Sequence, residues 1–240
     1  MSSDLLNDLR IEVADGKALF VIGAGVSLLA TNNAPAASWK GLLRDGAERV
    51  RRLQRSTDET LARIAAQIDS VDLQEMLSAV TFLAQKLGGP DDGEFRKWLQ
   101  ESIGELHATN PLIIETIGAT EATVVTTNYD GLIESVLHVP PVTWTDVDRC
   151  EQVLRGDERA VIHIHGYWER PDTVILGQDS YAILTHDERI QVFLRAAHLA
   201  KTFVYVGCGD GLGDPNFSQF LAWSERLFAG SRIRRYRLVR

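Results

Sequence analysis

The chain has 240 residues, of which 45% are apolar and 24% charged, and its formal net charge is −8. This length suits one large domain, and the acidic balance disfavours a direct nucleic-acid partner, because a negative surface repels phosphates. Two cysteines, Cys150 and Cys208, cannot build a four-cysteine zinc site, and we expect no metal. Without a signal peptide or an apolar run long enough to cross a membrane, the protein is expected to be cytoplasmic.

The first hundred residues contain one strand and a long helical region. Residues 4–14 have the apolar spacing of a short amphipathic helix. Ala18–Ile22 is an unbroken apolar run, typical of a strand in a parallel sheet covered on both faces. From 39 to 103 the apolar residues recur at helical spacing, most clearly in the segment 73–87. We interpret 39–103 as a helical module inserted between the first and second strands.

Beyond residue 109, strand-like and helix-like segments alternate. The expected strands are Ala122–Thr126, Val142–Trp144, Ala160–Ile164, Thr173–Leu176, Thr202–Val206 and Arg235–Val239. The expected helices lie near 110–118, 129–137, 187–200 and 216–228. This rhythm predicts one α/β domain over 1–240, with a doubly wound, mainly parallel, Rossmann-like sheet. Because the chain stops inside its last strand, we expect the native protein to be longer.

Four short stretches follow the ends of strand-like runs. They are Gly23–Ser27, Thr126–Asp130, His163–Gly166 and Gly207–Phe217. In an open α/β sheet the carboxyl ends of the parallel strands face one crevice, where ligands bind. We therefore expect the four stretches to surround a single ligand site.

Two of these stretches are rich in glycine. Gly23 and Gly25 would let the backbone approach a diphosphate, whose charge free N–H groups could meet. A purely structural turn is an equal alternative, because the third glycine of the usual dinucleotide fingerprint is missing. In the loop that begins at Gly207, Asp214 precedes Pro215 and is interpreted first as a helix N-cap and second as a ligand contact.

The other two stretches carry polar and ionisable side chains. Asn128 falls at a strand end, where its amide can hold a ribose hydroxyl or orient a water, while Asp130 contacts a ligand or simply opens the next helix. His163 and His165 are two apart on a strand and are expected to point the same way. His165 would face the crevice and transfer a proton at neutral pH. A buried structural role is the alternative for either histidine, and the favoured one for His163.

Taken together, the four stretches resemble the sirtuin superfamily. The turn Gly-Ala-Gly-Val-Ser, the Thr-x-Asn-x-Asp motif, the His165–Gly166 pair and the glycine loop occur in the family's order. The chain is most similar to the sirtuin-like NAD-hydrolysing domains of bacterial antiphage defence effectors. Those domains usually begin longer proteins or pair with a sensor, so we expect a homo-oligomer with a sensor domain or partner protein beyond this chain.

The resemblance also implies a substrate and roles for individual residues. NAD would be the substrate, and Asn128 and His165 would form the catalytic pair. The residues implied to bind NAD are Gly23, Ala24, Gly25, Ser27, Thr127, Asp130, Gly207 and Asp214. The favoured function is therefore an NAD glycohydrolase that releases nicotinamide and ADP-ribose or cyclic ADP-ribose.

The chain departs from the protein-deacylating sirtuins in two places. They carry a zinc module that two cysteines cannot build, and a Pro-Asp-Phe-Arg run where this chain has residues 34–39 and no arginine before Arg44. Deacylation is thus a less favoured alternative, behind a module that senses NAD or ADP-ribose without cleaving it. A dehydrogenase ranks last, because the glycine fingerprint is incomplete and helices follow the first strand.

Overall fold

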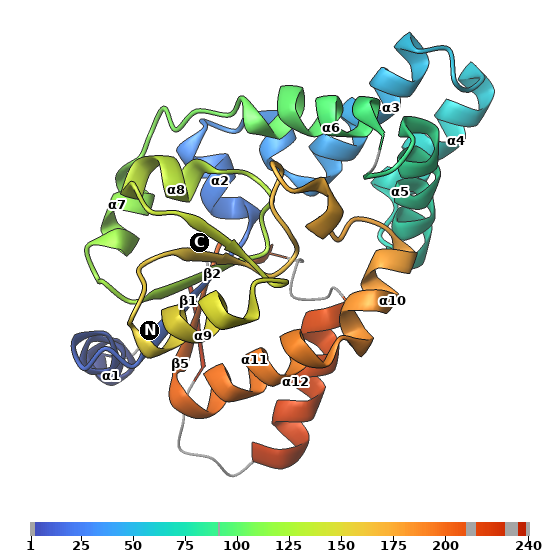
Figure 1. Cartoon of the computed structure of the whole chain (residues 1–240). Coiled ribbons are helices and arrows are strands. Elements are labelled where there is room, and N and C mark those ends of the chain that lie inside the picture. Colours follow the sequence, from blue (N-terminus) through green and yellow to red (C-terminus); the bar gives the residue numbers. More distant parts are fainter. Residues whose placement is uncertain (1–2, 91, 210–214, 229–234, 239–240) are drawn as a thin grey trace.

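The computed structural model describes residues 3–90, 92–209, 215–228 and 235–238 (Figure 1). Its sheet has the strand order β3-β4-β2-β1-β5-β6, and every neighbouring pair is parallel. The strands are β1 (Ala18–Ile22), β2 (Thr123–Thr126), β3 (Pro141–Thr143), β4 (Val161–His163), β5 (Thr202–Val206) and β6 (Tyr236–Leu238). The predicted parallel, Rossmann-like sheet is confirmed. Val239, which the sequence placed in the last strand, lies outside the described residues.

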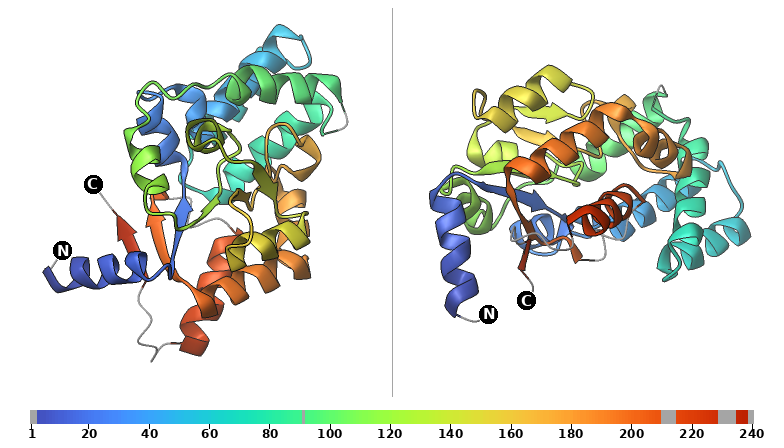
Figure 2. Two further views of the ribbon diagram at one scale, coloured as in Figure 1. Left: turned by 60° about the vertical axis from the view of Figure 1, so that its left-hand side comes forward. Right: turned by 90° about the horizontal axis from the view of Figure 1, so that it is seen from below.

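Helices cover both faces of this sheet. One face carries α1 (Ser3–Ala14), α2 (Ala24–Ala30), α7 (Leu112–Gly118) and α8 (Leu132–Leu137), and the other carries α9 (Val147–Arg155), α10 (Gln178–His186), α11 (Glu188–Ala200) and α12 (Pro215–Phe228). Phe20 and Ile22 of β1 pack toward the first group, whereas Leu19 and Val21 pack toward the second. The unbroken apolar run of β1 follows from this two-sided burial. In Figure 2, α1 extends outward beside the sheet.

Helices that lie between α2 and α7 in the sequence form a module with its own apolar core. They are α3 (Trp39–Arg52), α4 (Asp58–Asp69), α5 (Leu73–Leu87), α6 (Gly93–Leu99) and the π-helical η2 (Gln100–Gly104). Ser38 caps α3 by accepting a hydrogen bond from Gly41 N–H, and Gly88 ends α5 in the left-handed conformation, with φ +93°. Trp98 is fully buried and donates its indole N–H to Asp45 at 3.0 Å. In Figure 1 this module lies at the upper right.

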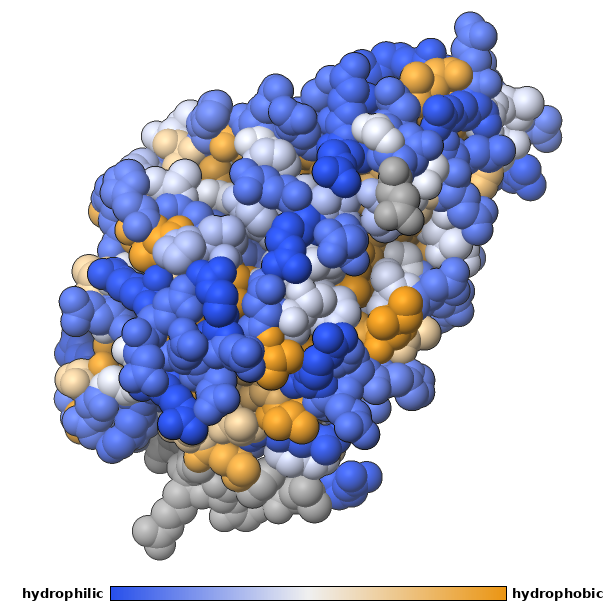
Figure 3. All heavy atoms as spheres, viewed as in Figure 1, coloured by the Kyte–Doolittle hydropathy of each residue, from blue (hydrophilic) through white to orange (hydrophobic). Residues whose placement is uncertain are grey.

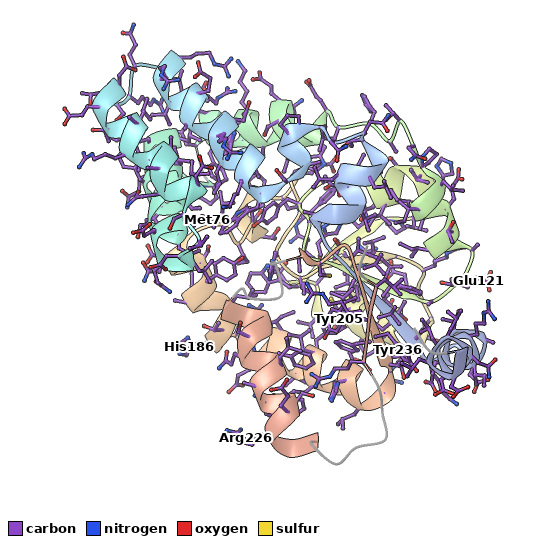
Figure 4. All side chains as sticks on the ribbon, turned by 180° about the vertical axis from the view of Figure 1, so that it is seen from behind. Met76, Glu121, His186, Tyr205, Arg226 and Tyr236 are labelled. Carbon is purple, nitrogen blue, oxygen red and sulfur yellow. The ribbon has the colours of Figure 1, made fainter. Side chains whose placement is uncertain are left out.

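The segment after β4 joins the module to the sheet. Val174 and Leu176 pack in the core of the module, whereas Ile175 packs against the sheet. The predicted strand Thr173–Leu176 is wrong: a 3₁₀ turn, η3 (Pro171–Thr173), comes first, and the next three residues belong to no strand. Their apolar character comes from burial between two cores, which mimics a strand pattern. Figure 4 shows both cores from behind, with Met76 in the module and Tyr205 and Tyr236 on neighbouring strands.

Other helix boundaries also differ from the prediction. The helix expected at 129–137 begins only at Leu132, and the helices α9 and α10 were not predicted. None of the described helices is long and apolar enough to cross a membrane. The face in Figure 3 is mainly hydrophilic, with scattered hydrophobic residues in its lower half. Exposed apolar side chains include Ile183 on α10 and Val192 and Leu199 on α11.

Candidate active site

The four stretches meet at one edge of the sheet, as predicted. Ile22 is paired in register with Thr126 on one side and with Val206 on the other, and Thr126 is paired with His163. Each of these residues is the last of its strand. The chain therefore leaves β1, β2, β4 and β5 along one line, at the edge where open α/β sheets bind ligands. Residues 210–214 of the fourth stretch, Asp214 among them, lie outside the described residues.

Asn128, Ser27 and Asp130 form a buried hydrogen-bonded chain at this edge. Asn128 Nδ2 donates to Ser27 Oγ at 2.8 Å, and Ser27 Oγ donates to Asp130 Oδ2 at 2.8 Å. Because Ser27 gives its only proton to Asp130, it must accept from Asn128, which fixes the orientation of the amide. No hydrogen bond from the described residues reaches Asn128 Oδ1. This oxygen is therefore available to accept one from a ribose hydroxyl or a water.

Asp130 precedes α8 but is not its first residue. Its Oδ1 accepts a hydrogen bond from Leu132 N–H at 3.2 Å, which satisfies one of the free donors at the start of that helix. Burial raises the pKa of Asp130, while the hydrogen bonds from Ser27 and Leu132 act in the opposite direction. Asp130 thus performs a helix-start role and a site role together, which the sequence had posed as alternatives.

His163 is completely buried beneath Asn128. Its Nδ1 lies 2.9 Å from the carbonyl oxygen of Asn128, and its Nε2 lies 2.5 Å from Glu134 Oε1 on α8. Burial lowers the pKa of His163, but the carboxylate of Glu134 and the carbonyl of Asn128 outweigh it, and the net direction is upward. Glu134 was not predicted as a site residue from the sequence. The sequence shows it as an acidic residue beside the apolar Leu132 and Ile133, near the start of a predicted helix.

His165 lies on the opposite side of the sheet edge from His163. Its ring packs edge to face on Tyr181 of α10, with 5.6 Å between ring centroids, and its carbonyl accepts from Ile175 N–H at 2.8 Å. The prediction that both rings point the same way is wrong, because β4 ends at His163 and the next two residues turn. His165 is only 3% exposed, so its ring is covered rather than open to solvent.

The two glycine turns are locked to each other through their backbones. Gly23 N–H donates to Val206 O, and Gly25 N–H donates to Gly207 O, each at 2.9 Å. A Cβ added to Gly23 would lie 2.6 Å from Cys208 Cα, and one added to Gly25 would lie 2.8 Å from Gly207 Cα. Close contact between the turns therefore explains these glycines.

The same contact limits which donors could meet a diphosphate. The N–H groups of Gly23 and Gly25 already donate hydrogen bonds to backbone carbonyls of the other turn and of β5. The third residue of this turn that was predicted to bind NAD, Ala24, is half-buried. Thr127 donates its N–H to Ile22 O at 3.1 Å, which ties the end of β2 to the end of β1. Binding of NAD by these residues stays a prediction.

A family model for the SIR2-like domain matches residues 122–240. This part of the chain belongs to the SIR2-like family. The matched range begins just before β2, so it holds Asn128, Asp130, His165 and Gly207. The turn at Gly23–Ser27 and the helical module precede it. The SIR2-like match thus covers both residues of the predicted catalytic pair.

A similar protein is Defense-associated sirtuin 2 of Bacillus subtilis. The two share 28% identity over 126 residues, which is 50% of this chain and 12% of the relative. The matched region therefore corresponds to a small part of a much longer protein. The whole relative's activity cannot be assigned from so short a region.

The described part of the chain shows no group of three His, Cys, Asp or Glu side chains placed to hold a metal ion. Both cysteines are free and buried, one on α9 and the other after β5. Burial raises the pKa of the Cys150 thiol to about 12, and the Cys208 thiol donates to Val21 O at 3.2 Å. These thiols serve as packed core groups.

Proposed function

We propose that this chain is an NAD glycohydrolase that releases nicotinamide and ADP-ribose, or cyclic ADP-ribose, as a toxic effector domain of antiphage defence. SIR2-like domains use NAD, and the name of the Bacillus subtilis relative supports a role in defence. The observation that carries the proposal is the oriented amide of Asn128. Its nitrogen donates to Ser27, which in turn donates to Asp130, and its oxygen is left as an acceptor at the sheet edge.

The reaction needs positioning more than strong covalent chemistry. The bond between ribose C1′ and the nicotinamide nitrogen breaks, and both electrons leave with the nitrogen, which becomes neutral. A water oxygen bonds to C1′ and gives up a proton, so the products are nicotinamide, ADP-ribose and a proton. Asn128 Oδ1 accepts a hydrogen bond from the water or from a ribose hydroxyl. The adjacent Asp130 favours the positive charge that develops on the ribose when it is ionised.

His165 is the proposed base for this reaction. A neutral imidazole can accept the proton from the water or a ribose hydroxyl. Its place after β4, beside the end of β2, supports this role. Cyclisation would use the same two residues, with a nitrogen of the adenine base in place of the water.

A sensor of NAD or ADP-ribose is the second candidate. Asn128 and His165 are only 8% and 3% exposed, so NAD reaches both only after neighbouring side chains shift. Such burial suits a module that changes conformation on binding as well as an enzyme that requires activation. Protein deacylation has weaker support, because the two cysteines are buried and separate.

The test is NAD consumption by the purified chain and by Asn128→Ala and His165→Ala, with the products resolved by chromatography. Loss of NAD with the parent and a loss of rate of about 100-fold or more in either variant is the expected result. An unchanged rate in His165→Ala would overturn the proposed base. Bound but intact NAD after long incubation, measured together with thermal stabilisation, would favour the sensor.

We further propose that the chain acts as a homo-oligomer in the cytoplasm, within a longer protein or beside a sensor partner. The size of the relative supports a longer protein, because the match covers only 12% of the relative. Mass measurement of the native protein in solution tests the oligomer. Repeating the NAD assay with the assembled native protein tests whether activity depends on assembly.

A further inference from the structure

His163 holds the backbone beneath the proposed catalytic amide. The N–H of Asn128 is fixed by Thr126 Oγ1 at 3.0 Å, its side chain by Ser27, and its carbonyl by His163 Nδ1. The ring of His163 is 0% exposed and is completed on its other side by Glu134. Three separate contacts therefore set the position of one residue, and His163 supplies the only one that comes from β4.

The partners of the ring decide where its protons lie. A carbonyl oxygen only accepts, so Nδ1 must carry a hydrogen. The 2.5 Å between Nε2 and Glu134 Oε1 requires one further proton between them, carried by either atom. Without that proton, two lone pairs would face each other in a buried site. The pair is thus neutral overall in either form, which is the form that burial favours.

The surroundings offer no substitute for this pair. Glu134 Oε2 is buried and has no hydrogen-bond partner among the described residues, so the carboxylate depends on His163. Two other titratable groups face the ring: Asp130, from the loop before α8, and Tyr167, whose ring centroid lies 4.8 Å away. Burial raises the pKa of Tyr167, which keeps its hydroxyl neutral.

We propose that His163 and Glu134 form a proton-sharing pair that positions Asn128 for cleavage at the nicotinamide ribose. This inference rests on the proposed function. His163 and Glu134 touch neither the substrate nor the reacting atoms, and they act through the Asn128 carbonyl. The pair matters for the rate because a displacement of about 1 Å in a catalytic group can cost on the order of 100-fold.

The decisive variant replaces the whole pair, His163→Phe together with Glu134→Leu. A buried ion pair can be exchanged for apolar groups with little loss of stability, whereas the carbonyl of Asn128 loses its donor. We expect kcat for NAD to fall about 10- to 100-fold, KM to change less, and the melting temperature to stay close to the parent's. An unchanged kcat in the folded variant would overturn the proposal and leave the proposed function intact.

His198→Phe is the matched control. His198 is also a buried histidine, but it hydrogen-bonds Ser224 and packs on Phe203, near the amino end of β5. We expect its kcat to match the parent's. An equal loss in the control would show that removal of any buried histidine slows the reaction, which would overturn the positioning role. A parent that leaves NAD intact would instead overturn the proposed function, and the positioning role with it.

Glu134→Gln tests the shared proton directly. Nitrogen-15 NMR of the histidine rings in the parent should show hydrogens on both nitrogens of His163, and in the variant a hydrogen on Nδ1 only. The alkaline fall in kcat should move to higher pH in the variant, because no carboxylate remains to face the deprotonated Nε2. An unprotonated Nε2 together with an ionised Glu134 in the parent at neutral pH, or an identical pH profile, would contradict the proton-sharing pair.

Discussion

Buried histidines lie at both ends of the sheet, and two of them, His163 and His198, differ in the direction in which their pKa is shifted. His163, at the carboxyl edge, contacts the carboxylate of Glu134, and its pKa is raised despite burial. His198, near the amino edge, contacts a serine hydroxyl and three aromatic rings, and burial lowers its pKa, with a smaller contribution from Arg235. Burial is common to both, so the partner decides the charge. Only the edge with the proposed chemistry buries carboxylates beside its histidine.

The comparison is tested most strongly by removing each ring. His163→Ala should lower the free energy of unfolding by about 3–5 kcal/mol, because Glu134 is left buried without a partner. His198→Ala should cost about 1–3 kcal/mol, because the partner that it leaves at Ser224 is a neutral hydroxyl. Urea unfolding at pH 7 measures both. Equal losses would mean that Glu134 is not an uncompensated charge in the first variant.

The packing of the carboxyl edge gives the next largest effect. Gly25→Ala should destabilise the protein by about 1–3 kcal/mol, because the new Cβ would lie 2.8 Å from Gly207 Cα. Gly93→Ala, at the start of α6, is the matched control. Nothing lies within 4 Å of its Cβ position, and we expect a gain of about 0.4–1 kcal/mol. Thermal unfolding of both variants checks the contrast, and a harmless Gly25→Ala would show that the two turns are not interlocked.

The pH dependence of stability should have opposite signs for the two histidines. The pKa of His163 is raised in the folded state, so its stabilising contribution is complete below about pH 6.5 and is lost as the pH rises through the folded pKa. Glu134→Gln should remove this alkaline loss. Denaturant unfolding between pH 6 and 9 measures it, with a slope of at most about 1.4 kcal/mol per pH unit. A parent and variant with parallel curves would contradict it.

His198 should change the stability with pH by a smaller amount and in the opposite direction. Its folded pKa is lowered, so the unfolded chain binds the proton first, and stability falls as the pH drops below about 6.5 toward the folded pKa. His198→Phe should flatten the stability curve in that window and leave the alkaline side unchanged. Unfolding between pH 5 and 7 is the measurement. A steeper acid loss in the variant would reverse the assigned sign.

The sequence predicted the strands well because burial leaves a direct pattern. The apolar runs at Ala18–Ile22 and Thr202–Val206 match β1 and β5 residue for residue. The same signal failed at 173–176, where an apolar segment packs between two cores without joining the sheet. Apolar runs report that a segment is buried, and only its backbone partners decide whether it is a strand.

The site was predicted in part for a related reason. A strand's end can be located from sequence, so the meeting of Asn128 with Ser27 and Asp130 followed once the strands were parallel and in register. The side of the sheet on which His165 lies could not be predicted, because it depends on β4 ending at His163, one residue earlier than expected. The hydrogen bonds of Gly23 and Gly25 were equally hidden, because their acceptors are the last residue of β5 and the residue that follows it, both distant in sequence.

By itself, the sequence determined the parallel sheet, the helical module and the edge at which the polar residues gather. These depend on apolar periodicity and on chain order, both of which are local properties. Only the tertiary structure decided that Glu134 meets His163, that Ser27 orients Asn128, and that the two glycine turns lock together. Each of these is a contact between residues distant in sequence, and its proton or orientation is set by a partner that no local pattern names.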